Sequence, residues 1–264
     1  TDIDDRGQEG LELAYDEWLQ GDPGAKKVLK DRYGRSVENV ENIKNPSKGN
    51  ELQLSIDKRV QFIAYRELKK AVTKHKARSG SAVVLDAVSG EILAMVNQPS
   101  YNPNNRSEFK GGRYRNRAIT DLFEPGSTIK PLAVATALDL GIINPNTKFN
   151  TAPGIMRIGR NTIKDVRNYG TINVKTIIAK SSNVGVSKIA LSITPEKMVG
   201  TMFDVGFGTD TGSGFPGEAS GQLINKERWH DIERATLSFG YGISATNLQL
   251  AQAYTVFANR GKLK

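Results

Sequence analysis

The sequence contains no cysteine and only two histidines, His75 and His230. Without cysteine the chain has no disulfide bonds, thiol nucleophiles or thiolate metal ligands. Two histidines leave little for a histidine-based triad or a zinc cluster. Any catalysis must therefore depend on serine, lysine and carboxylate side chains. The lack of cysteine decides no compartment, because it suits an exported bacterial protein as well as a cytosolic one.

Long apolar segments are also missing. The longest apolar stretches, residues 81–85 and 92–96, are far shorter than the about 20 residues that span a bilayer. The chain begins at Thr1 and opens with no signal-peptide pattern. We therefore expect a chain that is soluble as it stands, from which an upstream segment has been removed.

Basic residues outnumber acidic ones by 37 to 28, which gives a net charge of +9. Such a charge is compatible with binding to nucleic acid, with binding to an anionic surface, or with no specific partner. A basic cluster lies in residues 106–117, with Arg106, Lys110, Arg113, Arg115 and Arg117. It has neither an RNA-binding signature nor interleaved aromatic residues, so we interpret it as a solvated loop and expect no nucleic-acid partner.

The first fifty residues read as a small separate module. Apolar residues at helical spacing predict a helix over residues 9–19, and residues 26–40 resemble a hairpin. The polar, turn-rich segment 42–50 then indicates a domain boundary near residue 50. We expect one module over residues 1–50 and a larger domain over residues 51–264.

The larger domain shows an α+β pattern. A strand-like segment at 52–56 precedes a helix that Asp57 can cap and that runs to about residue 76. Residues 81–88 and 91–97 give the strongest hairpin signal. Further helices are expected over residues 128–140, 184–193, 195–205, 231–239 and 246–259. We predict a helical layer on one antiparallel sheet, some of whose strands lie outside the chain.

Ser127 and Lys130 form the first candidate site. Pro131 is tolerated only in a first helical turn, so it places a helix start near Ser127. The following helix is apolar on nearly every face, which predicts burial. At spacing i, i+3 the lysine can reach the serine hydroxyl, and burial lowers a lysine pKa from about 10.4 toward the range of a general base. The Ser127 N–H at the helix start could form half of an oxyanion hole.

The Ser-x-x-Lys spacing is weak evidence by itself. It also occurs at residues 55–58 and 107–110, which are followed by no buried helix and which we interpret as chance. A capping serine and a snorkelling lysine are the ordinary alternative for Ser127 and Lys130. The buried helix after Pro131 favours the catalytic interpretation.

A second candidate element is Ser181-Ser182-Asn183, at an expected turn between two helices. A hydroxyl and an amide two residues apart can relay a proton and hold a peptide group. An ordinary helix N-cap at Ser182 or Asn183 is the alternative. Ser100-Tyr101-Asn102 has the same spacing, which we interpret as accidental.

Together, Ser-x-x-Lys and the later Ser-x-Asn are two of the three motifs of penicillin-binding proteins and serine β-lactamases. From about residue 7 to its end, the chain resembles the division-type class B penicillin-binding proteins, the penicillin-binding protein 3 group. The longer strings that resemble them are residues 100–105, 115–121, 231–236 and 238–242.

The resemblance implies a penicillin-binding, β-lactamase-like transpeptidase domain preceded by part of an N-terminal pedestal module. It implies Ser127 as the acylated nucleophile, Lys130 as its base, Ser181 as proton relay and Asn183 as a substrate-amide contact. The implied reaction is D,D-transpeptidation of peptidoglycan stem peptides, with β-lactams as covalent ligands and without a metal or organic cofactor. The implied setting is the periplasmic face of the bacterial inner membrane, among membrane-bound division proteins, with an anchor helix outside this chain.

The third family motif, Lys-Thr-Gly or Lys-Ser-Gly, is absent from the 264 residues. In the family it supplies a cation for the substrate carboxylate and half of the oxyanion hole. We expect that residues beyond Lys264 contain it and that the chain without them could be inactive. The rival interpretations are a serine β-lactamase, for which the Glu-x-x-Leu-Asn segment of class A enzymes is not found, and a non-catalytic module that binds β-lactam or peptidoglycan.

Overall fold

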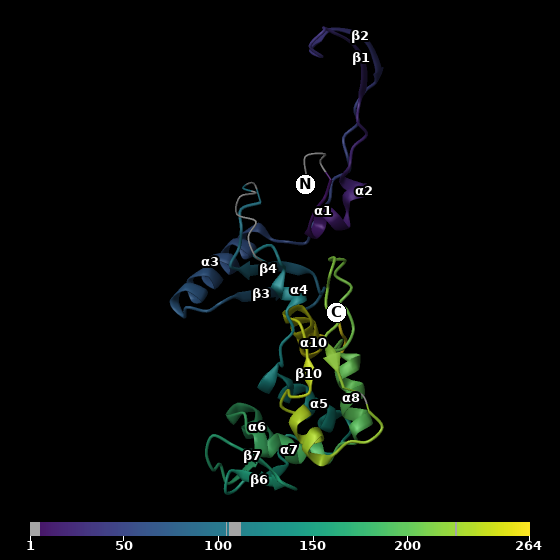
Figure 1. The fold of residues 1–264 in the computed structure, drawn as a ribbon. Helices are drawn as coiled ribbons and strands as arrows, with labels where there is room; N and C mark the ends of the chain where they lie inside the picture. The colour runs from purple at the N-terminus through teal and green to yellow at the C-terminus, as the bar shows by residue number, and fades with distance from the viewer. Residues whose placement is uncertain (1–5, 104, 106–111, 225) are drawn as a thin grey trace. The chain divides into compact units, whose positions relative to one another are not determined.

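The computed structural model describes residues 6–103, 105, 112–224 and 226–264. They form two compact units (Figure 1). The smaller unit comprises Thr1–Ser55 with Gly212–Gly217, and the larger one comprises Ile56–Thr211 with Glu218–Lys264. Each unit is considered by itself.

The smaller unit contains two short helices and a hairpin: α1 (Gly10–Ala14), α2 (Asp16–Leu19), β1 (Ala25–Lys30) and β2 (Ser36–Lys44). The single helix predicted over residues 9–19 is thus divided at Tyr15, whose φ of −118° is not helical. The predicted hairpin is confirmed. Asp31 closes its turn by accepting hydrogen bonds from the N–H groups of Tyr33 and Arg35. β2 extends into the segment predicted to be a turn-rich loop.

In the larger unit, α3 (Lys58–Lys74) begins where predicted, because Asp57 accepts hydrogen bonds from the first backbone N–H groups of the helix. It packs on the predicted hairpin of β3 (Gly80–Leu85) and β4 (Ile92–Gln98). Gln61 of α3 bonds both the N–H and the carbonyl of Met95. The strand predicted at residues 52–56 is wrong: this segment is irregular chain, and the boundary between the two units follows Ser55.

The five later helices are confirmed with shifts of a few residues. The turn η2 (Gly126–Ile129) leads into α5 (Lys130–Asp139), and α5 packs against α7 and α8 (Figure 1). The others are α7 (Asn183–Leu191), α8 (Pro195–Asp204), α9 (Asp231–Leu237) and α10 (Asn247–Ala258). Their apolar faces contribute Leu132, Val186, Ile189 and Met202 to the core, which also includes Ile129, Ile177 and Phe207.

Several short elements were not predicted from the sequence. The helices α4 (Arg117–Thr120) and α6 (Val174–Lys180) are two of them. The strand pairs are β5 (Lys148–Asn150) with β8 (Thr171–Asn173), β6 (Ile155–Ile158) with β7 (Asn161–Lys164), and β9 (Gln222–Leu223) with β10 (Ile243–Ser244). Segments of two to four residues are too short to show a strand period. The α+β class is confirmed, although the strands of the described residues pair only in twos, all antiparallel.

Part of the basic cluster can be located. Arg106 and Lys110 lie outside the described residues, as does the Ser-x-x-Lys copy at 107–110. Arg115 and Arg117 both form ion pairs with Asp121, at 2.6 and 2.9 Å. These ion pairs link the residues at the start of α4 to Asp121, which directly follows the helix. Throughout the described part of the chain, every helix is too short or too polar to cross a membrane.

Candidate active site

Ser127 lies on an exposed turn that leads directly into a buried helix. Gly126 enters the turn with a φ of +60°, which glycine adopts without steric cost. Ser127 is exposed, whereas Ile129 and Lys130 are buried. Pro131 stands in the first turn of α5, where its missing N–H leaves no hydrogen bond unmade. The turn thus presents one hydroxyl to solvent at the start of a buried helix.

Three contacts from distant segments fix this turn. Phe123 and Ala245 exchange two backbone hydrogen bonds of 3.1 and 3.0 Å. The Tyr254 hydroxyl of α10 donates to the Thr128 carbonyl at 2.7 Å. Gly240 packs directly against the backbone of Gly126. The position of Ser127 is therefore set by backbone contacts on both sides of it.

Lys130 connects the first motif to the second. Its side chain is only 2% exposed, and Nζ donates to the Ser181 carbonyl at 2.6 Å, to Ser181 Oγ at 2.9 Å and to Asn183 Oδ1 at 2.7 Å. Burial lowers the pKa of Lys130 from 10.5 to about 8, although the nearby Asp165 carboxylate opposes this by favouring the charged amine. A substantial fraction of the amine is thus neutral slightly above neutral pH.

The second motif occupies the turn between α6 and α7. Ser181 has a left-handed conformation, with φ of 52° and ψ of 44°, which is uncommon for a residue with a side chain. Its carbonyl and hydroxyl both accept from Lys130, so the strained conformation aims two acceptors at one amine. Asn183 Nδ2 donates to the Lys164 carbonyl at 2.9 Å, which leaves Oδ1 for Lys130.

The structure brings Lys130, Ser181 and Asn183 into direct contact and places Ser127 one turn before Lys130. Within the described residues, Nζ makes its hydrogen bonds with the second motif and none with the Ser127 hydroxyl. Such a bond can be absent before substrate binds, because catalytic hydrogen bonds often form only in the complex. The catalytic roles of the four residues remain predictions.

Asp165 belongs to the site but was not found from the sequence. It follows β7, accepts from the Ser182 hydroxyl at 2.7 Å and from the Val184 N–H at 3.0 Å, and acts electrostatically on Lys130. Ser182 in turn accepts from the Gly185 N–H and caps α7, as the alternative interpretation of this motif expected. One aspartate after a strand of four residues gives no sequence signal for these contacts.

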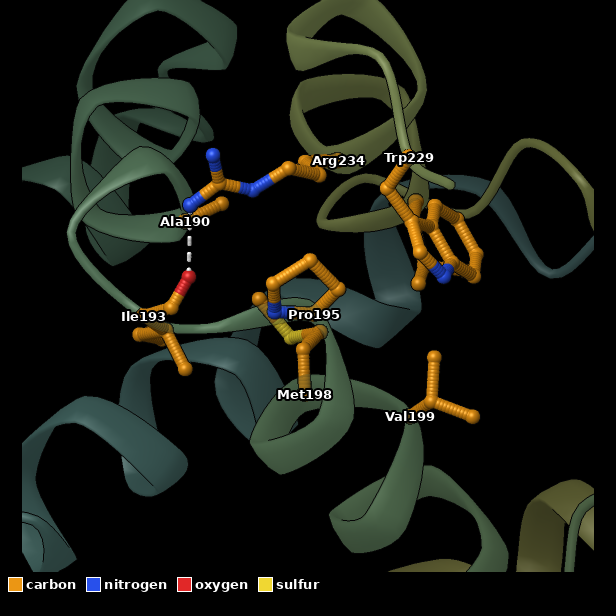
Figure 2. A pocket seen from close by; sticks show the side chains of 8 residues that line it. Ala190, Ile193, Pro195, Met198, Val199, Trp229 and Arg234 are labelled. Atoms are coloured by element: carbon orange, nitrogen blue, oxygen red, sulfur yellow. Dashed lines mark hydrogen bonds between the residues drawn. The ribbon is translucent and has the colours of Figure 1, made fainter. Parts of the chain in front are cut away.

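The far end of α7 is held by Arg234 of α9. Its guanidinium donates to the carbonyls of Leu191 and Ile193 at 2.9 and 2.7 Å, and Figure 2 shows the second of these bonds. Leu191 is the last residue of α7 and Ile193 lies just beyond it, so the arginine satisfies acceptors that the end of the helix leaves open. The cavity beside it is lined mainly by apolar side chains, including Met198 and Trp229. Asn183 therefore stands on a helix that is fixed at both ends.

The arrangement is suited to acyl transfer. An exposed hydroxyl at a helix start can attack a carbonyl, and the adjacent backbone N–H can stabilise the oxyanion that forms. A buried amine with a pKa of about 8 can accept the hydroxyl proton. In the described residues, no three His, Asp or Glu side chains are grouped to hold a metal ion.

Comparison with known proteins gives consistent matches. The family model described as "Penicillin binding protein transpeptidase domain" matches residues 80–264, and "Penicillin-binding Protein dimerisation domain" matches residues 2–54. The chain is 48% identical over 263 residues to the probable peptidoglycan D,D-transpeptidase PenA of Neisseria flavescens. It is 49% identical over 261 residues to the peptidoglycan D,D-transpeptidase FtsI of Escherichia coli K12.

Each of these alignments covers 99% of the chain, but 65% of the Neisseria protein and 44% of the Escherichia protein. The chain therefore spans about half the length of these curated relatives. Among solved structures, the transpeptidase domain of Burkholderia pseudomallei penicillin-binding protein 3 is similar, with a TM-score of 0.73 and 42% identity. That match covers 81% of this chain and 61% of the other.

Proposed function

The chain belongs to the penicillin-binding-protein transpeptidase family, and from this premise we propose that it is the Ser127 nucleophile region of a peptidoglycan D,D-transpeptidase. The substrate is a stem peptide that ends in D-Ala-D-Ala. Lys130 is the base, Ser181 relays the proton and Asn183 contacts the substrate amide. No metal or organic cofactor takes part.

In the acylation step, neutral Lys130 accepts the Ser127 Oγ proton while the oxygen attacks the penultimate D-Ala carbonyl carbon. The carbon–nitrogen bond to the terminal D-Ala then breaks. Its leaving nitrogen takes the proton through the Ser181 hydroxyl, which contacts Lys130 at 2.9 Å. The products are free D-Ala and an ester on Ser127.

In the second step, an amine of a neighbouring stem peptide attacks the ester carbon. The new carbon–nitrogen bond is the cross-link, and the departing Ser127 oxygen recovers a proton by the same route. A β-lactam takes the place of the donor peptide in the first step, but its ring-opened part stays attached and obstructs the second.

The observation that carries this proposal is the surroundings of Lys130. A lysine that is 2% exposed and has no carboxylate bonded to its amine needs a reason to be buried. A structural lysine would be served by an ion pair, whereas Lys130 contacts uncharged oxygens of Ser181 and Asn183, and its burial lowers its pKa to about 8, which suits a base.

The proposal is tested with the protein at its natural length, a synthetic pentapeptide ending in D-Ala-D-Ala and an amine acceptor. We expect release of D-Ala together with the cross-linked product, and neither with Ser127→Ala. Binding of the peptide without release of D-Ala would instead indicate a non-catalytic binding module.

A serine β-lactamase is distinguished by the fate of its benzylpenicillin adduct. The transpeptidase should release the penicilloyl group slowly, over many minutes. Continuous rapid hydrolysis of benzylpenicillin by the wild type, but not by Ser127→Ala, would contradict the transpeptidase assignment in favour of the β-lactamase.

We further propose that residues 1–50 are part of a non-catalytic pedestal, that the protein acts in division at the periplasmic face of the inner membrane, and that membrane-bound division proteins are its partners. The match of residues 2–54 to the dimerisation-domain model supports the first of these. Deleting residues 1–50 should abolish septal localisation of the protein while leaving acylation by benzylpenicillin intact. Unchanged septal localisation would contradict the proposal.

A further inference from the structure

We propose that Gly240 is a positioning residue for Ser127, holding the nucleophile turn by direct backbone contact. The inference rests on the proposed function, because it concerns the rate at which Ser127 is acylated. Gly240 touches no reacting atom in this account. It acts through Gly126, the residue before the nucleophile.

Gly240 lies in a segment that runs beside the nucleophile turn. The segment leaves α9 through hydrogen bonds from the Phe239 and Gly240 N–H groups to carbonyls of that helix, at 3.2 and 3.1 Å. Five residues after Gly240, Ala245 forms its two-bond bridge with Phe123. Residues 239–245 and 123–126 are thus adjacent, although more than a hundred positions separate them in the sequence.

The contact requires glycine at position 240. A Cβ built there would lie 2.5 Å from Gly126 Cα and closer still to the Gly126 nitrogen and oxygen. These are backbone atoms, so no side chain can rotate to make room. The φ of Gly240 is +91°, a conformation that residues with side chains rarely adopt.

The nucleophile turn cannot easily move away from such a side chain. The bridge to Ala245 holds it at Phe123, and the Tyr254 hydroxyl holds it at Thr128. Because the turn is held at Phe123 and at Thr128, it cannot shift as a whole. A Cβ at position 240 would therefore distort the backbone between these two points, which contains Gly126 and Ser127. A displacement of about 1 Å can slow a reaction by about 100-fold.

Gly242 provides a matched control. Its φ of +77° gives a substitution a similar backbone strain, but a Cβ there would meet only Ile224 Cδ1, at the ordinary contact distance of 3.6 Å. Comparing Gly240→Ala with Gly242→Ala therefore separates displacement of the turn from the general cost of alanine at positive φ.

The experiment measures benzylpenicillin acylation of Ser127 in the protein at its natural length, and resolves encounter binding from the acylation rate constant. Melting temperatures and deuterium uptake of residues 123–130 are measured in parallel. We expect Gly240→Ala to lower the acylation rate constant by about 100-fold with little change in the affinity of the encounter complex. The backbone amides of residues 123–130 should take up deuterium faster than in the wild type. Gly242→Ala, which has the backbone strain without the clash, should lose less melting temperature and keep the acylation rate within about 3-fold of the wild type.

Equal slowing in both variants, or an unchanged rate in Gly240→Ala, would overturn the inference. If Gly240→Ala does not fold, Tyr254→Phe tests the same restraint by removing the donor to Thr128 without adding an atom; a wild-type acylation rate would then count against it. If the wild type itself forms no adduct, the proposed function fails, and deuterium uptake still shows whether Gly240 holds the turn.

Discussion

The two turns of the site are held in different ways. The Ser127 turn is fixed by close backbone packing, with Gly240 against Gly126 and a two-bond bridge at Phe123. The turn of the second motif is fixed by polar side chains, because Asp165 accepts from Ser182 and Val184 and Asn183 bonds the Lys164 carbonyl. The first turn should therefore respond to added volume and the second to changes of charge or hydrogen bonding.

Lys130 is where the two turns meet. It is part of the helix that begins at the first turn, yet its amine is bonded by the second. The first turn thus determines where the nucleophile lies, and the second determines the direction in which the amine of the base points. Substitutions in each turn should accordingly give different kinetic signatures.

The largest expected effect is that of Lys130→Arg. A guanidinium stays charged at every accessible pH and cannot accept the Ser127 proton. Loss of a general base costs typically 10²–10⁴-fold, so we expect acylation by benzylpenicillin to slow by about 1,000-fold. Stopped-flow kinetics measures this. Lys188→Arg, whose parent lysine donates to the Asn150 carbonyl, is the control, and equal slowing in both would remove Lys130 from the mechanism.

A smaller loss is expected for Ser181→Ala. The variant removes the relay hydroxyl and one acceptor of Lys130 but keeps the carbonyl contact at 2.6 Å. The acylation rate constant should fall by about 100-fold, near the lower limit for acid–base groups. Ser192→Ala removes a hydroxyl bonded to the Ile189 carbonyl at the other end of α7 and should have little effect on the rate. A wild-type rate in Ser181→Ala would exclude the relay.

The subtlest prediction concerns pH. Because neutral Lys130 is the active form, the acylation rate of the wild type should rise with pH and level off above a midpoint near 8. Asp165 raises the pKa of Lys130, so Asp165→Asn should move this midpoint to lower pH. The rate profile between pH 5 and 10 measures the shift.

The control for this shift is Asp86→Asn. Asp86 likewise accepts two hydrogen bonds, from the N–H groups of Val88 and Ser89 in the turn between β3 and β4, but has no contact with the site. The Asp86→Asn variant should have a lower melting temperature, but the midpoint of its pH–rate profile should be the same as in the wild type. A midpoint that stays unchanged in Asp165→Asn, or moves to higher pH, would contradict the electrostatic account.

The sequence predicts the parts of this molecule that depend on local patterns. Asp57 caps its helix as expected, and the apolar run after Pro131 forms the buried helix that makes Lys130 unusual. Ser-x-x-Lys and Ser-x-Asn mark the residues of the site by their spacing, and the structure places Lys130 in contact with Ser181 and Asn183, whose roles stay predictions.

Contacts between distant segments could not be predicted in this way. Nothing in the sequence distinguishes Asp165 from other aspartates, because its role depends on the contact with Ser182 in the folded chain. In the same way, only the contact with Gly126 distinguishes Gly240 from the other glycines among the 26 in the sequence. The strand expected at residues 52–56 is wrong because a short apolar–polar pattern does not by itself determine a strand.

The most direct test of the account is intact-protein mass spectrometry of the protein at its natural length, with and without benzylpenicillin. Peptide mapping then locates the adduct, with Ser127→Ala as the control. The account predicts one benzylpenicillin per chain, bound to Ser127 and absent from the variant. An adduct that persists in Ser127→Ala, or none on the wild type, would contradict the claim that Ser127 is the nucleophile.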